Sequence, residues 1–222
     1  MTDIFSFILV MVSLVLAIGV TQLVHGVASL IRLRGSMRPE PLPLVWAASL
    51  FLVAAIYWWS LWDFRSVDWR FHHFFYLLLA PTLLHVAASL LVSTDAVAAG
   101  ANTRSEFDRI RVPFMVVMAA FSIVVAFDAW ILGVESFWTN FRPIQLWTVA
   151  LYVAGATLAG VRAQRIVAGL VLVTYLAAGF FFLVAHETLR LGSAELAPGR
   201  RRLLALGGGV AAGLMSAFTF TH

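Results

Sequence analysis

Hydrophobic residues fill most of the chain in long runs that short polar stretches separate. The runs cover residues 4–31, 44–64, 71–93, 113–134, 144–161 and 166–186, with a weaker seventh run at 203–220. A hydrocarbon core of about 30 Å needs about 20 apolar residues in a helix, and six of the runs meet or approach that length, the shortest being 144–161. Because backbone groups inside lipid must pair within their own segment, long uninterrupted runs indicate helices, whereas a β-barrel would show short alternating ones. The pattern predicts an all-α, polytopic transmembrane helical bundle with six to seven spans.

The longest connection, 94–112, lies between the third and fourth runs. It contains Thr103-Arg-Ser-Glu106, a capping-box pattern that predicts the start of a short helix through Arg111. Pro113 would then open the fourth span, since proline favours the first turn of a helix. We therefore expect one transmembrane domain over residues 1–222, with a short helix in the 94–112 loop.

Composition agrees with this class and excludes several kinds of chemistry. The chain is 62% hydrophobic with a mean hydropathy of +0.93, far above a soluble domain. It has no Cys, which excludes disulfides, thiolate metal sites, iron–sulfur clusters and covalently attached haem. It also has no Lys, so a retinal Schiff base of the rhodopsin type is excluded. We read the net charge of +4 as anchoring of loops at the bilayer rather than nucleic-acid binding.

The distribution of arginine predicts the orientation. The first, third and fifth connections hold eight of these residues, Arg32, Arg34, Arg38, Arg104, Arg109, Arg111, Arg162 and Arg165. The second and fourth connections hold three, Arg65, Arg70 and Arg142. By the positive-inside rule the N-terminus lies outside. Arg190 and the Arg200–Arg202 cluster would then be outside after six spans, and the 203–220 run would be either a seventh span or a tail on the membrane surface.

Three ionisable residues are predicted to lie within spans, which is costly unless each meets a partner or water. Asp128, His85 and His25 descend from the outer to the inner half of the bilayer on the fourth, third and first runs. We interpret them as a track for ions, most readily protons. Three further residues near the outer boundary would form its mouth: Asp63, His72 and His73.

His85 has a specific local context. Pro81 removes the hydrogen bond that would reach the carbonyl of Leu77, and His85 follows four residues later on the same helix face. A free carbonyl near an imidazole would be a place for water, and imidazole exchanges protons near neutral pH. The alternative is a buried neutral histidine bonded to a neighbouring helix.

The other two track residues also have structural alternatives. Thr21, Gln22 and His25 share one helix face beside Gly26, a pattern that is common where polar groups join two helices. Asp128 has no partner nearby in sequence and must find an Arg, His or Tyr across the bundle. The aromatic stretch from Tyr57 to Arg65 ends the second run at the outer boundary and is read as a membrane-interface belt rather than as a ligand-binding box.

Cofactor sites are weaker hypotheses. Two axial haem ligands should face each other at similar depth, and His25 and His85 fit this poorly, whereas His73 and His186 share the outer boundary. A zinc site from His72, His73 and His186 with an acid has no supporting motif. No set of acid, nucleophile and base indicates an enzyme, so we expect no bound cofactor, with haem b as the exception to test.

Small residues indicate where helices pack closely. The pairs Gly155/Ala159 and Gly209/Gly213 each place two small side chains on one face of a helix. Such faces serve contacts within the bundle or between copies, and we expect a homo-oligomer.

Two stretches, Leu16 to Arg32 and Tyr57 to Arg65, resemble a group of uncharacterised small bacterial multi-pass membrane proteins. The resemblance is best over the first three runs and weakens after about residue 130. It implies a bacterial origin and the inner membrane, and it carries no activity or site residues to this chain.

The sequence therefore leads to one main hypothesis and two alternatives. The main one is an ion channel or ion-coupled transport protein that uses the His25, His85 and Asp128 track. The first alternative is a non-catalytic membrane sensor or scaffold that docks a partner through its Arg-rich cytoplasmic loops. The second is a haem-b electron carrier.

Overall fold

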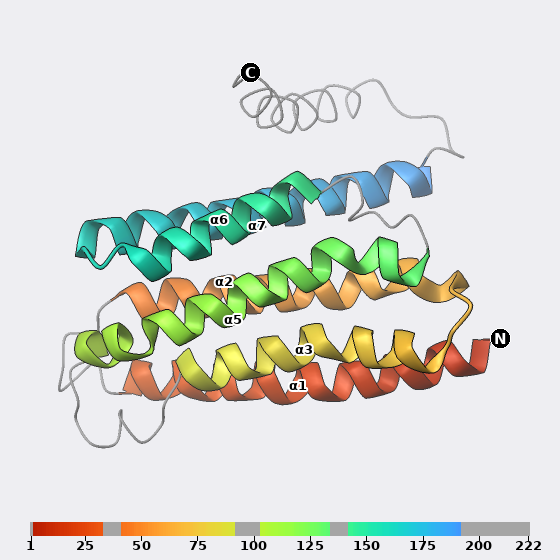
Figure 1. The fold of residues 1–222 in the computed structure, drawn as a ribbon, viewed down its shortest axis with the longest axis horizontal. Coiled ribbons are helices and arrows are strands. Elements are labelled where there is room, and N and C mark those ends of the chain that lie inside the picture. The colour runs from red at the N-terminus through yellow and green to blue at the C-terminus, as the bar shows by residue number, and fades with distance from the viewer. Residues whose placement is uncertain (1, 33–40, 92–102, 134–141, 192–222) are drawn as a thin grey trace. The chain divides into compact units, whose positions relative to one another are not determined.

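The computed structural model describes residues 2–32, 41–91, 103–133 and 142–191, and every secondary-structure element among them is helical (Figure 1). The chain divides into two compact units, Met1–Thr174 and Tyr175–His222, and the boundary falls within the last helix. The first unit contains the described polar residues discussed below. The described part of the second unit is the end of that last helix, up to Leu191.

Six α-helices coincide with the six strong hydrophobic runs. They are α1 (Thr2–Arg32), α2 (Pro41–Ser60), α3 (Phe71–Leu91), α5 (Thr103–Leu132), α6 (Arg142–Thr157) and α7 (Val161–Leu191), and a short 3-10 helix, η2 (Leu61–Ser66), continues α2. The predicted all-α class is thus confirmed for the described residues.

Five of these helices are long and apolar enough to cross a membrane. The candidate spans are Ile4–Ser29, Pro41–Ser66, Phe71–Leu91, Phe107–Leu132 and Val161–Phe181. Helix α6 has 16 residues, a length of about 24 Å that falls short of a full hydrocarbon core. The structure therefore supports a multi-pass membrane protein with five candidate spans, and the predicted seventh run at 203–220 lies outside the described residues.

The prediction of a separate short helix before Pro113 is wrong in one respect. A helix does begin at Thr103, but it continues through Pro113 to Leu132. Proline removes only one backbone hydrogen bond, and contacts on both sides of Pro113 hold the helix together. Phe107 before it and Phe114 after it are both buried, so packing outweighs the lost bond.

Helices α5 and α3 bury regular stripes. On α5 the buried positions Phe114, Met118, Phe121, Val125, Asp128 and Leu132 alternate in steps of four and three. This spacing is that of a helix packed along its length against neighbours. On α3 a similar stripe begins at His73 and continues through Leu77, Ala80 and Leu84. Asp128 thus occupies a position where an apolar residue would be expected.

The helices of the first unit are not equally close. The backbones approach most closely between α5 and α6, between α1 and α3, and between α3 and α5, and Figure 1 shows α1 beside α3. Helix α2 meets α5 through large rings instead, with Trp46 edge-on to Phe114 at 5.3 Å and Tyr57 edge-on to Phe121 at 6.0 Å. Large side chains keep two helix backbones apart, so α2 lies at a wider spacing from α5.

Two glycines make the close contacts possible. A Cβ atom on Gly19 of α1 would lie 3.2 Å from the Cα of His85 on α3. A Cβ on Gly155 of α6 would lie 2.8 Å from the sulfur of Met115 on α5. The predicted packing role of Gly155 is therefore located within the bundle, whereas Ala159 is exposed after the end of α6. Gly209 and Gly213 lie outside the described residues.

Candidate functional site

Asp128 lies in the core of the bundle, on the membrane-spanning part of α5. Its side chain is 2% exposed, and among the described residues its Oδ2 atom has no hydrogen-bond partner. A carboxyl group in this position is costly unless something holds it, which makes it the leading candidate for function.

Tyr76 of α3 is the nearest polar partner of Asp128. Its hydroxyl donates a hydrogen bond to the backbone carbonyl of Val124, and it also makes a side-chain hydrogen bond with the Asp128 carboxyl. A tyrosine hydroxyl has a single proton to donate. If that proton goes to Val124, the second bond is complete only when the carboxyl carries a proton and donates it to the Tyr76 oxygen. The Tyr76 hydroxyl can thus donate to Val124 beside a neutral carboxyl or turn its proton toward a charged one, and burial away from water disfavours the charge.

Tyr57 of α2 completes this group, which we call the Asp128 cluster (Asp128, Tyr76 and Tyr57). Tyr57 is 2% exposed and interacts electrostatically with Asp128. Its hydroxyl donates to the carbonyl of Leu77 at 3.0 Å. This is the carbonyl that Pro81 leaves without its helical partner. Tyr57 thus ties α2 to α3 at the proline and occupies the position that we expected for water near His85.

His85 lies elsewhere on α3, opposite Gly19. Because the α1 and α3 backbones approach closely there, no room is left for an imidazole between them, and the ring is half-buried. Among the described residues its Nδ1 has no hydrogen-bond partner.

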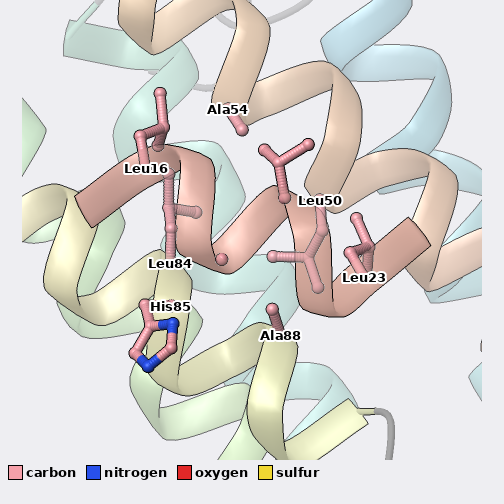
Figure 2. Close-up of a pocket in the computed structure, with 9 residues that line it drawn as sticks. Leu16, Leu23, Leu50, Ala54, Leu84, His85 and Ala88 are labelled. Atoms are coloured by element: carbon pink, nitrogen blue, oxygen red, sulfur yellow. The ribbon is translucent and has the colours of Figure 1, made fainter. Parts of the chain in front are cut away.

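The pocket beside His85 is small and apolar. It has a volume of about 10 Å³, close to the smallest space that holds one water molecule. Figure 2 shows Leu16, Leu23, Leu50 and Leu84 around it, with the His85 ring at its edge. A water molecule needs two or more polar partners, which this lining does not supply.

His25 is exposed on α1, whereas its neighbour Gln22 joins two helices. The Oε1 atom of Gln22 accepts a hydrogen bond of 2.6 Å from the hydroxyl of Ser89 on α3. The alternative interpretation of this face, a polar contact between helices, is therefore confirmed for Gln22. His25 is not part of that contact.

The structure does not bring the three track residues together. Along α3, His85 is nine residues from Tyr76, about 13 Å at the rise of a helix. Along α1, His25 is six residues beyond Gly19, about 9 Å further. Asp128 is buried among tyrosines, His85 borders an apolar pocket and His25 is exposed, so a continuous track stays a prediction.

The predicted outer mouth is near the start of α3. His73 is 8% exposed and its Nδ1 accepts a hydrogen bond from the backbone N–H of Arg70 at 3.4 Å. The ring of His72, which is exposed, lies 4.2 Å from that of His73. Asp63 is half-buried in η2. The aromatic stretch from Tyr57 to Arg65 contains two kinds of residue. Trp58, Trp59 and Trp62 are exposed, as expected for an interface belt, whereas Tyr57 is buried.

Arg111, from the Arg-rich third connection, forms hydrogen bonds at the C-terminal end of α6. Its guanidinium donates to the carbonyls of Gly155 at 3.0 Å and Leu158 at 2.9 Å. Gln164, which is fully buried, donates to the same two carbonyls. A cation at the C-terminal end of a helix satisfies carbonyls that have no partner in the helix. The Arg104 side chain lies outside the described residues.

Among the described residues, no three His, Asp or Glu side chains lie close enough to share an ion. The side chain of His186, which belonged to the zinc and haem hypotheses, is outside the described residues.

Sequence reasoning missed Tyr76 and misread Tyr57 as part of the interface belt. The signal for Tyr57 was present in Pro81, because a free carbonyl inside a membrane needs a donor. No feature of the sequence near Pro81 identified Tyr57 as the residue that supplies this donor.

The comparisons with known proteins add no relative: no protein-family model matches the chain, and no curated protein and no solved structure is significantly similar to it.

Proposed function

We propose that this protein conducts protons, or couples protons to transport, through reversible protonation of Asp128. The observation that carries the proposal is a carboxyl group that is almost fully buried in a membrane-spanning helix and hydrogen-bonded to Tyr76, whose hydroxyl also reaches the carbonyl of Val124. An intramembrane acid of this kind is typical of proton relays.

Loss of the proton would change the contacts of two helices. A carboxylate cannot donate to Tyr76, so the Tyr76 hydroxyl would have to turn from the carbonyl of Val124 toward the new charge. That exchange alters the contact between α3 and α5. Proton binding is thereby linked to helix packing, which is what coupling to a second solute requires.

Access from the predicted outer side is short. Tyr76 is six residues after Arg70, which immediately precedes α3, or about 9 Å along the helix axis, and His73 lies about one turn before Tyr76. The proposed path runs from Asp63, His72 and His73 to the Asp128 cluster. The inner leg passes His85 and His25 and requires the α1 and α3 contact at Gly19 to loosen.

The proposal includes the orientation and location that the sequence favours. The arginine distribution supports an outside N-terminus, and the resemblance to small bacterial proteins supports the inner membrane. Attaching a reporter to the 33–40 connection would test the orientation, with an inside location expected.

Proton flux in proteoliposomes tests the proposal directly. An imposed pH gradient should dissipate through the wild-type protein at a rate that Asp128→Asn abolishes, because the amide cannot release a proton. Tyr76→Phe should slow it. Ser122→Ala is a matched control, since Ser122 is a fully buried polar residue of the same helix and contacts Thr148 rather than Asp128.

A chemical probe tests the protonation state independently of transport. Dicyclohexylcarbodiimide reacts with protonated carboxyl groups in apolar surroundings, so mass spectrometry should find the adduct on Asp128 and lose it in Asp128→Asn. Absence of both the adduct and the flux in correctly folded wild-type protein would overturn the proposal.

A further inference from the structure

A second polar region lies on the outside of the bundle, across α1 and α3. Its exposed members, which we call the α1/α3 polar face, are Thr21, Gln22, His25, Thr82 and Ser89. Counted from the midpoints of the spans Ile4–Ser29 and Phe71–Leu91, they lie about 2 to 13 Å along the helix axes. This places them within the half-thickness of about 15 Å of a hydrocarbon core, on the side facing away from the other helices.

Two members of this face already have all the hydrogen bonds that they need. Thr82 donates to the carbonyl of Leu78 at 2.7 Å. Ser89 donates to the carbonyl of His85 at 2.9 Å or to Gln22 at 2.6 Å. Hydroxyls that bond to their own helix are tolerated in lipid.

The remaining groups have no such partner in the described part of the chain. They are the amide N–H groups of Gln22, the imidazole of His25 and the hydroxyl of Thr21. Lipid tails offer neither donors nor acceptors, so leaving these groups against lipid is costly. Polar side chains of this type commonly hold membrane helices together.

We infer that the α1/α3 polar face is an interface between two copies of this chain within the membrane. Two copies with the same orientation are related by a two-fold axis along the membrane normal, which brings residues of equal depth against each other. Gln22 would meet Gln22 of the second copy, and His25 would meet its counterpart.

A second copy fits because each of these side chains complements itself. An amide has both donors and acceptors, and a neutral imidazole has one of each. The Gln22 oxygen still has a free lone pair after accepting from Ser89. The inference does not depend on Asp128, and the two proposals can fail separately.

Cross-linking tests the location, and the chain suits it because it has no native Cys. Ile18→Cys places one thiol on α1 one turn from Thr21, where the wild-type side chain is 49% exposed. Oxidation in native membranes should yield a covalent dimer. Val116→Cys on α5, where the side chain is 57% exposed, is the matched control and should stay monomeric.

The strength of the interface is measured by energy transfer between labelled copies at increasing lipid dilution. Replacing both polar anchors, as in Gln22→Leu with His25→Leu, should weaken self-association roughly three- to thirty-fold, the range of polar contacts between membrane helices. Thr157→Val on α6, outside the α1/α3 polar face, removes an exposed hydroxyl that already bonds to the carbonyl of Val153 and should leave association unchanged. Helical circular dichroism verifies that each variant is folded.

Three results would overturn the inference. One is a folded wild-type protein that stays monomeric at all dilutions. Another is equal cross-linking of Ile18→Cys and Val116→Cys, which indicates random collision. The third is an intramolecular disulfide between Ile18→Cys and Gly209→Cys, which would assign the covering of this face to the 203–220 segment of the same chain.

Discussion

The Asp128 cluster and the α1/α3 polar face belong to the same helical unit, yet one is buried and the other exposed. At the Asp128 cluster, the rings of Tyr57 and Phe121 meet at 6.0 Å and keep α2 apart from α5. At the polar face, Gly19 lets α1 approach the backbone of α3 at His85. The large rings between α2 and α5 leave space for the Tyr57 side chain inside the bundle, whereas the close contact at Gly19 leaves none for the His85 ring between α1 and α3.

The difference also concerns how polar groups are satisfied. In the Asp128 cluster, tyrosines from α2 and α3 reach across helices to the carbonyls of Leu77 and Val124. At the polar face, the hydroxyls bond mostly within their own helix. The hydrogen bonds of the Asp128 cluster join particular pairs of helices. Those at the polar face lie mostly within one helix and leave Gln22 and His25 available to a partner.

The largest expected loss of stability comes from disrupting the close contact between α1 and α3 at Gly19. Gly19→Val would place side-chain atoms against the backbone of His85, which cannot move as a flexible side chain would. We expect a loss of about 2–3 kcal/mol in the free energy of unfolding, typical of overpacking. Unfolding in detergent, followed by circular dichroism, measures it.

Gly169→Ala is the control for this substitution. A Cβ at Gly169 on α7 meets nothing within 4 Å, so alanine should be neutral or stabilise by up to about 1 kcal/mol through helix propensity. Equal losses for Gly19→Val and Gly169→Ala would show that the α1 and α3 contact is not close.

A smaller loss of stability is expected when Tyr57 can no longer donate a hydrogen bond to the Leu77 carbonyl, which Pro81 leaves free. Tyr57→Phe leaves the Leu77 carbonyl without a donor, and we expect it to lower the free energy of unfolding by about 1–2 kcal/mol. In a Pro81→Ala background the restored backbone N–H of residue 81 bonds to Leu77, so the same change should cost less. A double-mutant cycle measures this coupling, and strictly additive losses would contradict it.

The smallest effect on stability is expected from a substitution of His85. The same substitution also tests whether His85 takes part in proton conduction. His85→Leu should change the free energy of unfolding by less than about 0.5 kcal/mol, because the ring lies at the edge of an apolar pocket. If the inner leg of the proposed path uses this imidazole, proton flux is lost while stability is kept. Unchanged flux in this variant would remove His85 from the path and leave the Asp128 proposal to its own test.

Much of the fold was predictable because the signal is local. The run 71–93 corresponds to α3, Phe71–Leu91, and 44–64 corresponds to α2 with η2. Hydrophobic length is enough for this, since every backbone group in lipid must pair within its own helix. Pro113 shows the limit, because the sequence indicates a break there and the packing of Phe107 and Phe114 overrides it.

The sequence by itself determined that the protein is a bundle of apolar helices and that Asp128 has no partner among its neighbours in the chain. Only the tertiary structure decided which polar residues meet. Tyr57 bonds to Leu77, 20 residues away, and Tyr76 to Val124, 48 residues away. The physical reason is that a vacant carbonyl or a buried carboxyl shows from the sequence that a partner is needed, whereas the packing of the helices decides which side chain reaches it.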